Sequence, residues 1–270
     1  MDNDAVVLVT GASSGFGAAT AKLLASRGMR VFGTSRRAEE TKNDGPFTRL
    51  RLDVRSAESV ETCVARVLAS AGRIDALVNN AGYTFASAVE EASIEEAKAQ
   101  METNFFGAAR MMRAVLPIMR RQRGGRIVNM TSLAGLLGVP FHAYYSASKF
   151  ALEGLSEGLR QEVRCFGIHV SCIEPGDFKT GVTAGRAQAK EGIDAYAGMR
   201  DRAIGIMKDS EQAGPDPSGV AERVARILAA RRPKLRYRVG ADARWVPRLR
   251  RLMPEFLFEA ALRRNYRIPS

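Results

Sequence analysis

Residues 5–20, with the sequence AVVLVTGASSGFGAAT, decide the class of fold. The run at 5–10 is almost continuously apolar, which is typical of a strand covered on both faces. It leads into a turn that contains Gly11, Gly15 and Gly17, and a helical pattern follows. Glycines let a backbone approach a pyrophosphate, and a helix N-terminus offers it free N–H groups. The spacing is G-x-x-x-G-x-G rather than G-x-G-x-x-G, but its placement between strand and helix favours a dinucleotide-binding loop over a plain turn.

The same alternation of apolar runs and helical patterns continues along the chain. Further strands are predicted at 30–35, 48–54, 74–80, 125–132, 168–176 and 234–239. Helices are predicted at 15–27, 56–71, 93–123 (with a break), 143–166 and from 216, where Asp216 is read as the N-cap and Pro217 as the first helical residue. We therefore predict a single α/β domain over 1–270. It is a doubly wound Rossmann domain, with a mostly parallel sheet between helices on both faces and a C-terminal helical extension.

The composition is that of an ordinary globular protein, with 46% apolar and 26% charged residues. No apolar run approaches the ~20 residues that span a bilayer. The first residues, MDNDAVVLVT, run directly into a strand and do not resemble a secretory signal. Cys165 and Cys172 lie in apolar contexts, so we expect buried, reduced thiols and a cytoplasmic location. His142 and His169 are too isolated for a metal site. His142 lies three residues before Tyr145 and could line a site, but a structural role is the favoured interpretation.

The formal net charge of +12 is concentrated near the C-terminus. Residues 231–267 hold twelve Arg or Lys and three acids, a net +9. Apolar residues interleave with the arginines, which predicts a basic helical extension at 241–270. Packing of these helices on the domain is the favoured interpretation, and weak contact with a membrane surface is a second one. A nucleic-acid footprint is a third, although we expect no nucleic acid as partner.

The end of the second predicted strand indicates which dinucleotide is bound. An acidic residue there would bind a ribose 2′-hydroxyl, whereas an arginine accommodates a 2′-phosphate. The sequence has Ser35 at that position, followed by Arg36 and Arg37, and Glu39 and Glu40 come too late. NADP(H) is therefore favoured over NAD(H), with Arg36 the better candidate and Arg37 a solvated surface residue.

The stretch YYSASK at 144–149 places a tyrosine one helical turn before a lysine. Tyr145 and Lys149 are four residues apart and would share a helix face, whereas Tyr144 would not. A neighbouring cation favours a phenolate, so Lys149 is expected to lower the pKa of Tyr145 and make it a general acid and base. By itself the pair also fits two idle, exposed side chains.

Seven motifs in order decide between these alternatives. They are TGASSGFG (10–17), LDV (52–54), NNAG (79–82), Asn104 in TNFFG, Ser132 in NMTS, YYSASK (144–149) and EPG (174–176). With them, residues 5 to about 240 resemble the short-chain dehydrogenase/reductase family. The resemblance implies an enzyme that transfers a hydride between a nicotinamide and a carbonyl or secondary alcohol.

The same resemblance assigns roles to individual residues. Tyr145 would be the general acid and base, Lys149 would lower its pKa and hold the nicotinamide ribose, and Ser132 would donate to the substrate oxygen. Asn104 would kink its helix and hold a water in the proton relay. The cofactor-binding residues would be Gly11, Ser13, Ser14, Gly15, Phe16, Gly17, Ser35, Arg36, Asp53, Val54, Asn80, Ala81, Gly82, Tyr145, Lys149, Pro175, Gly176 and Thr180.

The C-terminal part of the chain points to a branch of that family. Residues 236–264 and the stretch EPGDFKT (174–180) resemble relatives of 17β-hydroxysteroid and retinol dehydrogenases, which implies a lipophilic ketone or alcohol. A ketoacyl-thioester or small-ketone reductase is the alternative enzyme. A cofactor-binding regulatory or nucleic-acid-binding protein is the alternative of another class. Small residues in the helices at 104–123 and 143–166 suit a homo-oligomer, a dimer or tetramer.

Residues 179–213 lack a clear strand or helix period. So long an irregular insert is often a lid, and the resemblance places a substrate loop here. We predict a mobile substrate lid, and an ordinary pair of packed surface helices is the alternative.

Overall fold

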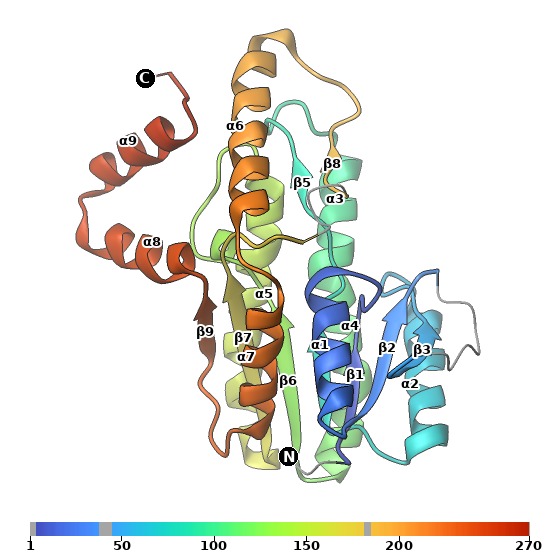
Figure 1. Cartoon of the computed structure of the whole chain (residues 1–270). Helices are drawn as coiled ribbons and strands as arrows, with labels where there is room; N and C mark the ends of the chain where they lie inside the picture. The colour runs from blue at the N-terminus through green and yellow to red at the C-terminus, as the bar shows by residue number, and fades with distance from the viewer. Residues whose placement is uncertain (1–3, 38–44, 181–184, 270) are drawn as a thin grey trace.

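The computed structural model describes residues 4–37, 45–180 and 185–269, and its centre is a parallel sheet (Figure 1). The strands of this sheet run in the order β3-β2-β1-β4-β6-β7-β9. Their bounds are β1 Val6–Val9, β2 Arg30–Ser35, β3 Thr48–Arg51, β4 Ala76–Asn79, β6 Gly125–Met130, β7 Ile168–Pro175 and β9 Arg236–Val239. The chain order reverses between β1 and β4, which is where a doubly wound sheet opens a crevice for ligands. The predicted fold class is confirmed.

Helices cover both faces of the sheet (Figure 1). They are α1 Gly15–Ser26, α2 Ala57–Ala71, α3 Ile94–Met101, α4 Gly107–Arg121, α5 Ala143–Glu162, α6 Asp194–Ala213, α7 Ser218–Ala229, α8 Ala241–Leu252 and α9 Glu255–Asn265. Alternate residues of β1 show why both faces are needed. Val6 and Leu8 join the core under α2, α4 and α5, whereas Val7 and Val9 join the core under α1 and α7. The period of two therefore explains the continuous apolar run.

Two details of the predicted helices were tested by the structure. The break in 93–123 is a π-helical turn, Glu102–Phe106, between α3 and α4. The start of α7 differs by one residue, because Pro217 is the N-cap and Asp216 lies outside the helix. Asp216 still accepts a hydrogen bond from the Ser218 N–H at 2.8 Å, so it stabilises the turn before the helix rather than capping it.

The prediction of buried cysteines was wrong for Cys165. Cys63 and Cys172 are buried, but Cys165 is exposed in the short turn Arg164–Phe166 that follows α5. Apolar neighbours in the sequence do not decide which way a turn residue faces.

The segment 179–213 is more regular than the sequence indicated. Residues 181–184 lie outside the described part, β8 (Ala187–Gln188) pairs with β5 (Phe85–Ala86), and the whole range 194–213 is the helix α6. Ala203 and Met207 are the buried residues of α6, so its apolar stripe is narrow. A narrow stripe gives little periodicity, which explains why the sequence pattern did not reveal this helix.

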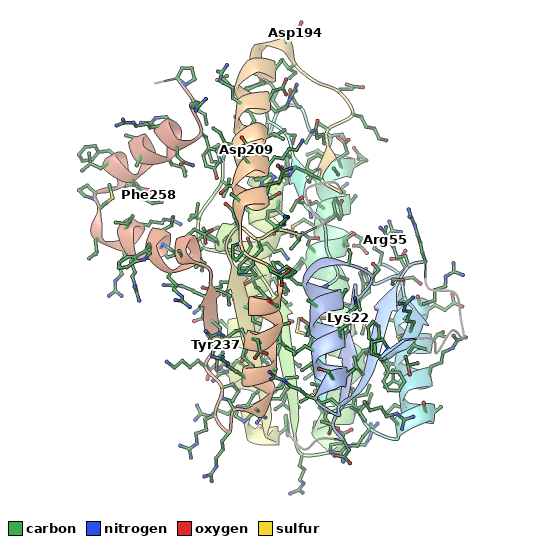
Figure 2. The ribbon with its side chains drawn as sticks, in the orientation of Figure 1. Lys22, Arg55, Asp194, Asp209, Tyr237 and Phe258 are labelled. Carbon is green, nitrogen blue, oxygen red and sulfur yellow. The ribbon has the colours of Figure 1, made fainter. Side chains whose placement is uncertain are left out.

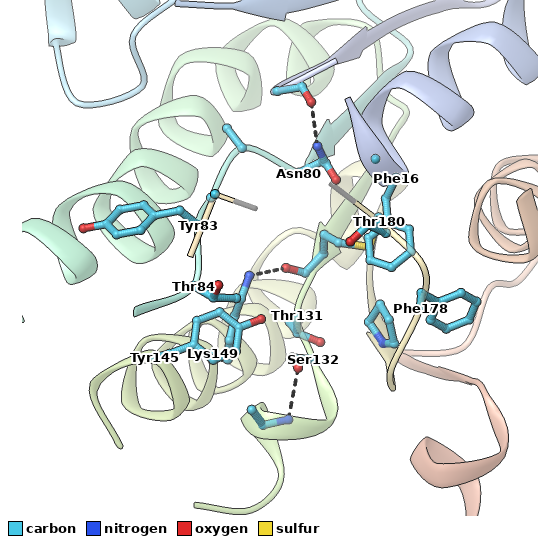
Figure 3. Close-up of a pocket in the computed structure, with 18 of the residues that line it drawn as sticks. Phe16, Asn80, Tyr83, Thr84, Thr131, Ser132, Tyr145, Lys149, Phe178 and Thr180 are labelled. Carbon is cyan, nitrogen blue, oxygen red and sulfur yellow. Dashed lines mark hydrogen bonds between the residues drawn. The ribbon is translucent and has the colours of Figure 1, made fainter. Parts of the chain in front are cut away.

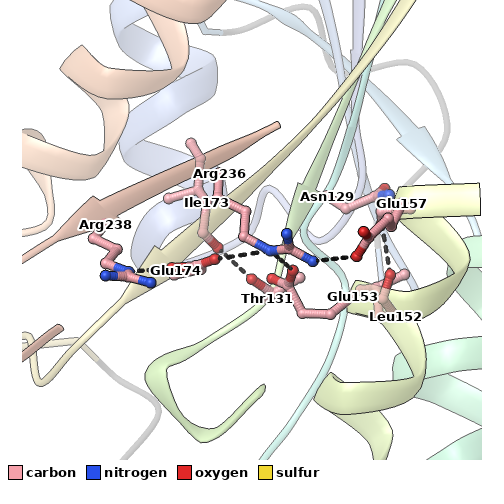
Figure 4. Close-up of polar contacts among 10 residues, drawn as sticks. Asn129, Thr131, Leu152, Glu153, Glu157, Ile173, Glu174, Arg236 and Arg238 are labelled. Atoms are coloured by element: carbon pink, nitrogen blue, oxygen red, sulfur yellow. Dashed lines mark hydrogen bonds and ion pairs between the residues drawn. The ribbon is translucent and has the colours of Figure 1, made fainter. Parts of the chain in front are cut away.

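The strand β9 is fixed to the domain by an ion-pair network (Figure 4). Arg236 contacts Glu153 at 2.9 Å and Glu157 at 2.7 Å, both on α5, while Arg238 contacts Glu174 at 3.1 Å. Glu153 and Glu174 are buried and Arg236 contacts both, so removing Arg236 would leave a buried carboxylate without its ion pair, which typically costs about 3–5 kcal/mol. The network therefore holds the point from which α8 and α9 extend.

None of the helices in the described ranges is both long enough and apolar enough to cross a membrane.

Candidate active site

A cavity of about 550 Å³ lies along the carboxyl ends of the sheet strands. The loops after β1, β2, β3, β4, β6 and β7 line it, and Figure 3 shows the part around Tyr145. Residues of α6 and of the tail after α9 also line it. This is the crevice at the reversal of strand order, where an open α/β sheet binds its ligands.

Glycines in the loop after β1 are required by close backbone contacts. Gly11 has φ +66°, and a Cβ there would lie 2.9 Å from the Ala81 Cα. At Gly17 a Cβ would lie 2.3 Å from the Gly11 carbonyl oxygen. The loop therefore packs closely against the segment that follows β4 and against the first turn of α1. The N-terminus of α1 is left facing the cavity. These residues fit the pyrophosphate of a dinucleotide.

The NNAG stretch braces this loop. The Asn80 side-chain amide donates to the carbonyl oxygens of Thr10 and Gly11, each at 3.0 Å. The Thr10 hydroxyl accepts from the backbone N–H groups of Asn80 at 3.0 Å and Ala81 at 2.9 Å. Asn80 and Ala81 line the cavity as predicted. Holding the glycine loop in place is an additional role that the sequence did not reveal.

The far end of the cavity is strongly basic. Ser35, Arg36 and Asp53 line it, and Arg55 pairs with Asp53 at 2.6 Å. Hydrogen bonds from Arg55 lower the pKa of Asp53 to about 2. An adjoining hollow is lined by the five arginines Arg36, Arg37, Arg51, Arg55 and Arg66. Glu39 and Glu40 lie outside the described residues.

Three of the predicted catalytic residues meet at the middle of the cavity (Figure 3). Ser132, just after β6, and Tyr145, on α5, share a side-chain hydrogen bond. The Ser132 oxygen also accepts from the Ala134 N–H at 3.1 Å, which fixes its position. Lys149 lies one turn after Tyr145, with Nζ 5.7 Å from the centre of the Tyr145 ring.

The expected lowering of the Tyr145 pKa by Lys149 is wrong for this structure. Burial raises the pKa of Tyr145 to about 12, and the hydrogen bond with Ser132 offsets this only in part. Burial also lowers the pKa of Lys149 to about 8. The ammonium group donates to the Met130 carbonyl oxygen at 2.8 Å, rather than contacting the phenol. At neutral pH Tyr145 is therefore a neutral phenol, ready to donate a proton rather than accept one.

Asn104 lies behind the cavity wall, in the π-helical turn between α3 and α4. Its amide donates to the Tyr83 carbonyl oxygen at 3.0 Å and to the Ser148 hydroxyl at 3.1 Å. Its carbonyl oxygen accepts from the Tyr83 N–H at 3.1 Å. The expected irregularity of the helix at Asn104 is present, and its role in a proton relay stays a prediction.

The structure brings the predicted site residues together. All of them line the cavity except Gly17, which lies under the glycine loop, and Asn104. The residues that line the cavity are Gly11, Ser13, Ser14, Gly15, Phe16, Ser35, Arg36, Asp53, Val54, Asn80, Ala81, Gly82, Ser132, Tyr145, Lys149, Pro175, Gly176 and Thr180.

Several cavity residues were not predicted. His142, interpreted as structural, lines the cavity with its ring centre 5.5 Å from that of Tyr145, and burial lowers its pKa to about 3. In the sequence, the only indication of this position was that His142 lies three residues, about one helical turn, before Tyr145. Asp177, Glu211 and Tyr266 also line the cavity. Glu211 and Tyr266 are distant in sequence from every motif, so only the fold could reveal them.

The C-terminal extension contacts the turn beside the cavity through Asp242. Its carboxylate accepts from the Asp177 N–H at 2.8 Å, and a Cβ at Gly176 would lie 1.9 Å from it. This contact requires the glycine of EPG, and it joins the start of α8 to the turn beside the cavity.

A family model described as short chain dehydrogenase matches residues 5–191. The chain belongs to the short-chain dehydrogenase family. Enzymes of this family are oxidoreductases that act on alcohol and ketone groups of small molecules with a nicotinamide cofactor, and the glycine loop and the long cavity fit such a cofactor.

Individual members of the short-chain dehydrogenase family resemble this chain over most of its length. A 3-ketodihydrosphingosine reductase from Bacteroides thetaiotaomicron is 40% identical over 97% of this chain and 98% of its own. The rat estradiol 17-beta-dehydrogenase 1 is 37% identical over 86% of this chain and 72% of its own. A solved short-chain dehydrogenase/reductase from Burkholderia phymatum, in complex with NAD, superimposes with a TM-score of 0.80 at 25% identity. It covers 93% of this chain and 95% of that one.

Proposed function

We propose that this enzyme uses NADPH to reduce the ketone of a long-chain amino ketone, such as 3-ketodihydrosphingosine, to the secondary alcohol. The central observation is the neutral phenol of Tyr145 beside Ser132 in a cavity with an acidic, partly apolar wall. The similarity to the Bacteroides reductase supports the substrate class, because it includes the C-terminal extension as well as the shared domain.

The proposed chemistry begins at the carbonyl oxygen. The bound nicotinamide supplies the hydride. Ser132 and Tyr145 donate hydrogen bonds to the substrate oxygen, which becomes an alkoxide and takes the proton of the Tyr145 hydroxyl. The raised pKa of Tyr145 keeps this proton available at neutral pH, which is what the reduction requires.

Lys149 would stabilise the phenolate that Tyr145 becomes. With a pKa of about 8, its ammonium group is mostly protonated at neutral pH. It lies in a buried setting, where a nearby positive charge acts more strongly than in water. We propose that it stabilises the Tyr145 phenolate after the proton has left, and that a water held at Asn104 delivers a replacement proton by way of Lys149.

The basic end of the cavity supports NADP(H) as cofactor. Arg36 lines both the cavity and the adjoining arginine-rich hollow, and Asp53 is already paired with Arg55. A 2′-phosphate would find five arginines there against two carboxylates, Asp53, which is paired with Arg55, and Glu58. Arg36→Gln should therefore lower kcat/KM for NADPH about ten-fold and leave that for NADH unchanged. Arg37→Gln, the matched control, should have a smaller effect, and an equal loss with both cofactors would contradict the assignment.

The substrate wall supports an amino ketone. Asp177 and Glu211 line it, the latter already paired with Arg186, together with the apolar Phe178, Ile206 and Met207. Partial desolvation and the neighbouring carboxylates of Asp242 and Glu211 raise the pKa of Asp177, so an ammonium group nearby would be stabilising. The apolar residues would contact the hydrocarbon chain.

A substrate panel with NADPH and NADH tests the proposed function. It contains a long-chain amino ketone, the same chain without the amine, a 17-ketosteroid, retinal and a ketoacyl thioester. The amino ketone should give the highest kcat/KM. A preference for the steroid or retinal would instead support the broader lipophilic substrate class, and a preference for the thioester would support the alternative reductase.

We further propose that residues 179–213 close over the substrate. Their described part lines the cavity through α6 and is attached to the domain near Glu91, which accepts from the Ile193 N–H at 3.0 Å and pairs with Arg200. Hydrogen exchange should slow across α6 when NADPH and a substrate analogue bind together. Slow exchange that ligands do not change would support a fixed helix instead.

We also propose a homo-oligomer formed through α4 and α5. Ala147, Gly154 and Gly158 are exposed on α5, and a Cβ at either glycine would meet nothing within 4 Å. Light scattering at several protein concentrations should give at least a dimer. Gly154→Arg should shift it to monomer.

A further inference from the structure

The C-terminal extension carries an unusual concentration of exposed apolar side chains. Ten large apolar side chains are strongly exposed in the described residues, and five of them lie within 245–257. These five form what we call the C-terminal apolar face: Trp245, Leu249, Leu252, Phe256 and Leu257. Leu252 is 81% exposed and Phe256 67%. Clustered exposure of this kind marks an interaction surface.

Arginines flank this face in a regular pattern along α8. Trp245, Leu249 and Leu252 follow the spacing i, i+4, i+7 and share one side of the helix. Arg244, Arg248 and Arg251 have the same spacing one position earlier, and all three are exposed. The Arg248 guanidinium lies 5.2 Å from the centre of the Trp245 ring. The three arginines therefore form a row along α8 beside the row of apolar side chains.

The contacts of α8 and α9 leave this face open. The start of α8 is held by the buried Ala243 and by the Asp242 contact, and Arg250 donates to the Leu136 carbonyl oxygen. No residue of α9 is buried. Figure 1 shows both helices beside the sheet domain, and Figure 2 shows side chains of these helices pointing away from it.

The charge of the extension indicates the chemistry of its partner. Residues 241–269 contain seven arginines and three acids, a net +4. Nucleic acid would use the charge but not the aliphatic residues of the face. An anionic lipid surface would use both, because its headgroups attract arginine while Trp, Phe and Leu enter the acyl boundary.

We propose that α8 and α9 dock this enzyme on an anionic membrane surface, lying in the plane of the interface. Asn265, the last residue of α9, and Tyr266, directly after it, line the cavity. The docked helices would therefore adjoin the substrate entrance. This last point rests on the proposed lipid substrate, whereas the docking itself does not.

The sequence provides a direct reporter for the test, because Trp245 is the only tryptophan. The whole protein is mixed with phosphatidylcholine vesicles, or with vesicles containing 30% phosphatidylglycerol. Trp245 emission should shift to shorter wavelength with the anionic vesicles, be quenched by brominated acyl chains, and respond little to the neutral vesicles. Flotation in 0.15 M salt should recover the protein with the anionic vesicles. The absence of a shift and of flotation would overturn the proposal.

Paired variants separate the contributions of charge and apolar surface. Arg248→Gln/Arg251→Gln should weaken binding about 25-fold, taking about five-fold for each arginine near an anionic surface. Leu249→Ser/Leu252→Ser should abolish flotation. The control Arg120→Gln/Arg121→Gln changes the same charge at exposed positions near the end of α4, just before the amino end of β6, whereas α8 follows the carboxyl end of β9. Ile94→Ser is the apolar control, since Ile94 is 58% exposed on α3.

Each outcome of the variants bears on the proposal. Equal binding by the C-terminal variants and their controls would overturn it. A lipid-free dimer that only Leu249→Ser/Leu252→Ser dissociates would assign the face to a second copy and also overturn it. Binding requires no turnover, so failure of the proposed function would leave this result standing. If both proposals hold, Leu249→Ser/Leu252→Ser should lose turnover of vesicle-embedded ketone and keep that of a short, water-soluble ketone.

Discussion

The cavity has two sides that are built differently. On the sheet side, Thr10, Asn80, Ser132 and Lys149 each have a backbone partner within 3.1 Å. On the outer side, α6 buries only Ala203 and Met207, and α9 buries no residue. The sheet side is therefore held by hydrogen bonds in a dry core, while the outer side is held mainly by ion pairs and a few apolar contacts.

This difference suggests a division of tasks. Positioned groups with shifted pKa values suit the chemical step, which tolerates little displacement. A sparsely packed outer side can differ between relatives or move without loss of the fold. Changes on the sheet side should thus affect kcat, and changes on the outer side should affect KM or lipid binding. Four predictions test this division.

The largest effect is expected from Tyr145→Phe, which removes the proton donor. It should lower kcat by ~10²–10⁴-fold and leave the Kd for NADPH within a few-fold, measured by steady-state kinetics and cofactor fluorescence. Tyr144→Phe is the matched control, because the Tyr144 hydroxyl donates to the Val89 carbonyl oxygen at 3.4 Å and does not line the cavity. A larger loss in Tyr144→Phe would show that the donor is misassigned.

Ser132→Ala should lower kcat by ~10²–10³-fold, the usual cost of one donor to a developing oxyanion. KM should change little, because the hydrogen bond strengthens mainly in the transition state. Ser146→Ala is the control, since Ser146 is buried and does not line the cavity, and its oxygen accepts from the Val139 N–H at 3.2 Å. An effect on KM alone would indicate that Ser132 acts in substrate binding rather than in the chemical step.

Lys149→Met should reveal the cost of burying a cation on the sheet side. The pKa of Lys149 is lowered from 10.5 to about 8, so between these values the unfolded chain binds more protons and stability rises with pH. The shift corresponds to about 3 kcal/mol at most, or ~10² in the unfolding constant. The variant should be more stable than wild type at pH 7 and lose most of this advantage by pH 10. Urea unfolding at both pH values measures it, with Lys22→Met as the exposed control.

The smallest effect is expected on the outer side. Asp177→Asn should raise KM for a long-chain amino ketone about ten-fold, or ~1.4 kcal/mol, with little change in kcat or in KM for the amine-free ketone. The Ser210 hydroxyl, which donates to Asp177 at 2.6 Å, can still donate to asparagine. Asp209→Asn is the control, because Asp209 is an exposed acid on α6, the helix that carries Ser210. A fall in kcat for both substrates would contradict the assignment of the chemical step to the sheet side and of substrate binding to the outer side.

Much of the sheet side was predictable because its signals are local. The alternation of apolar runs predicted the strands of the large sheet, and the glycines at 11, 15 and 17 predicted the turn before α1. The four-residue spacing placed Tyr145 and Lys149 on one face of α5. Each of these features depends on residues only a few positions apart, for which backbone geometry allows few conformations.

The outer side was less predictable because its partners are distant in sequence. The narrow apolar stripe of α6 concealed a helix of 20 residues. Asp242 and the Asp177 N–H that it contacts are 65 residues apart in the sequence, and no local sequence pattern predicts the contact.

The sequence by itself determined the doubly wound fold, the family and many of the residues that meet in the cavity. Only the tertiary structure decided the protonation of Tyr145, the bracing of the glycine loop by Asn80, and the closure of the cavity by α6 and Tyr266. The physical reason is the range of the effects. Backbone conformation is set mainly by near neighbours, whereas a pKa depends on desolvation and charge summed over every group within several ångströms. Lys149 is one helical turn from Tyr145, yet burial by the whole fold outweighs it and raises the Tyr145 pKa.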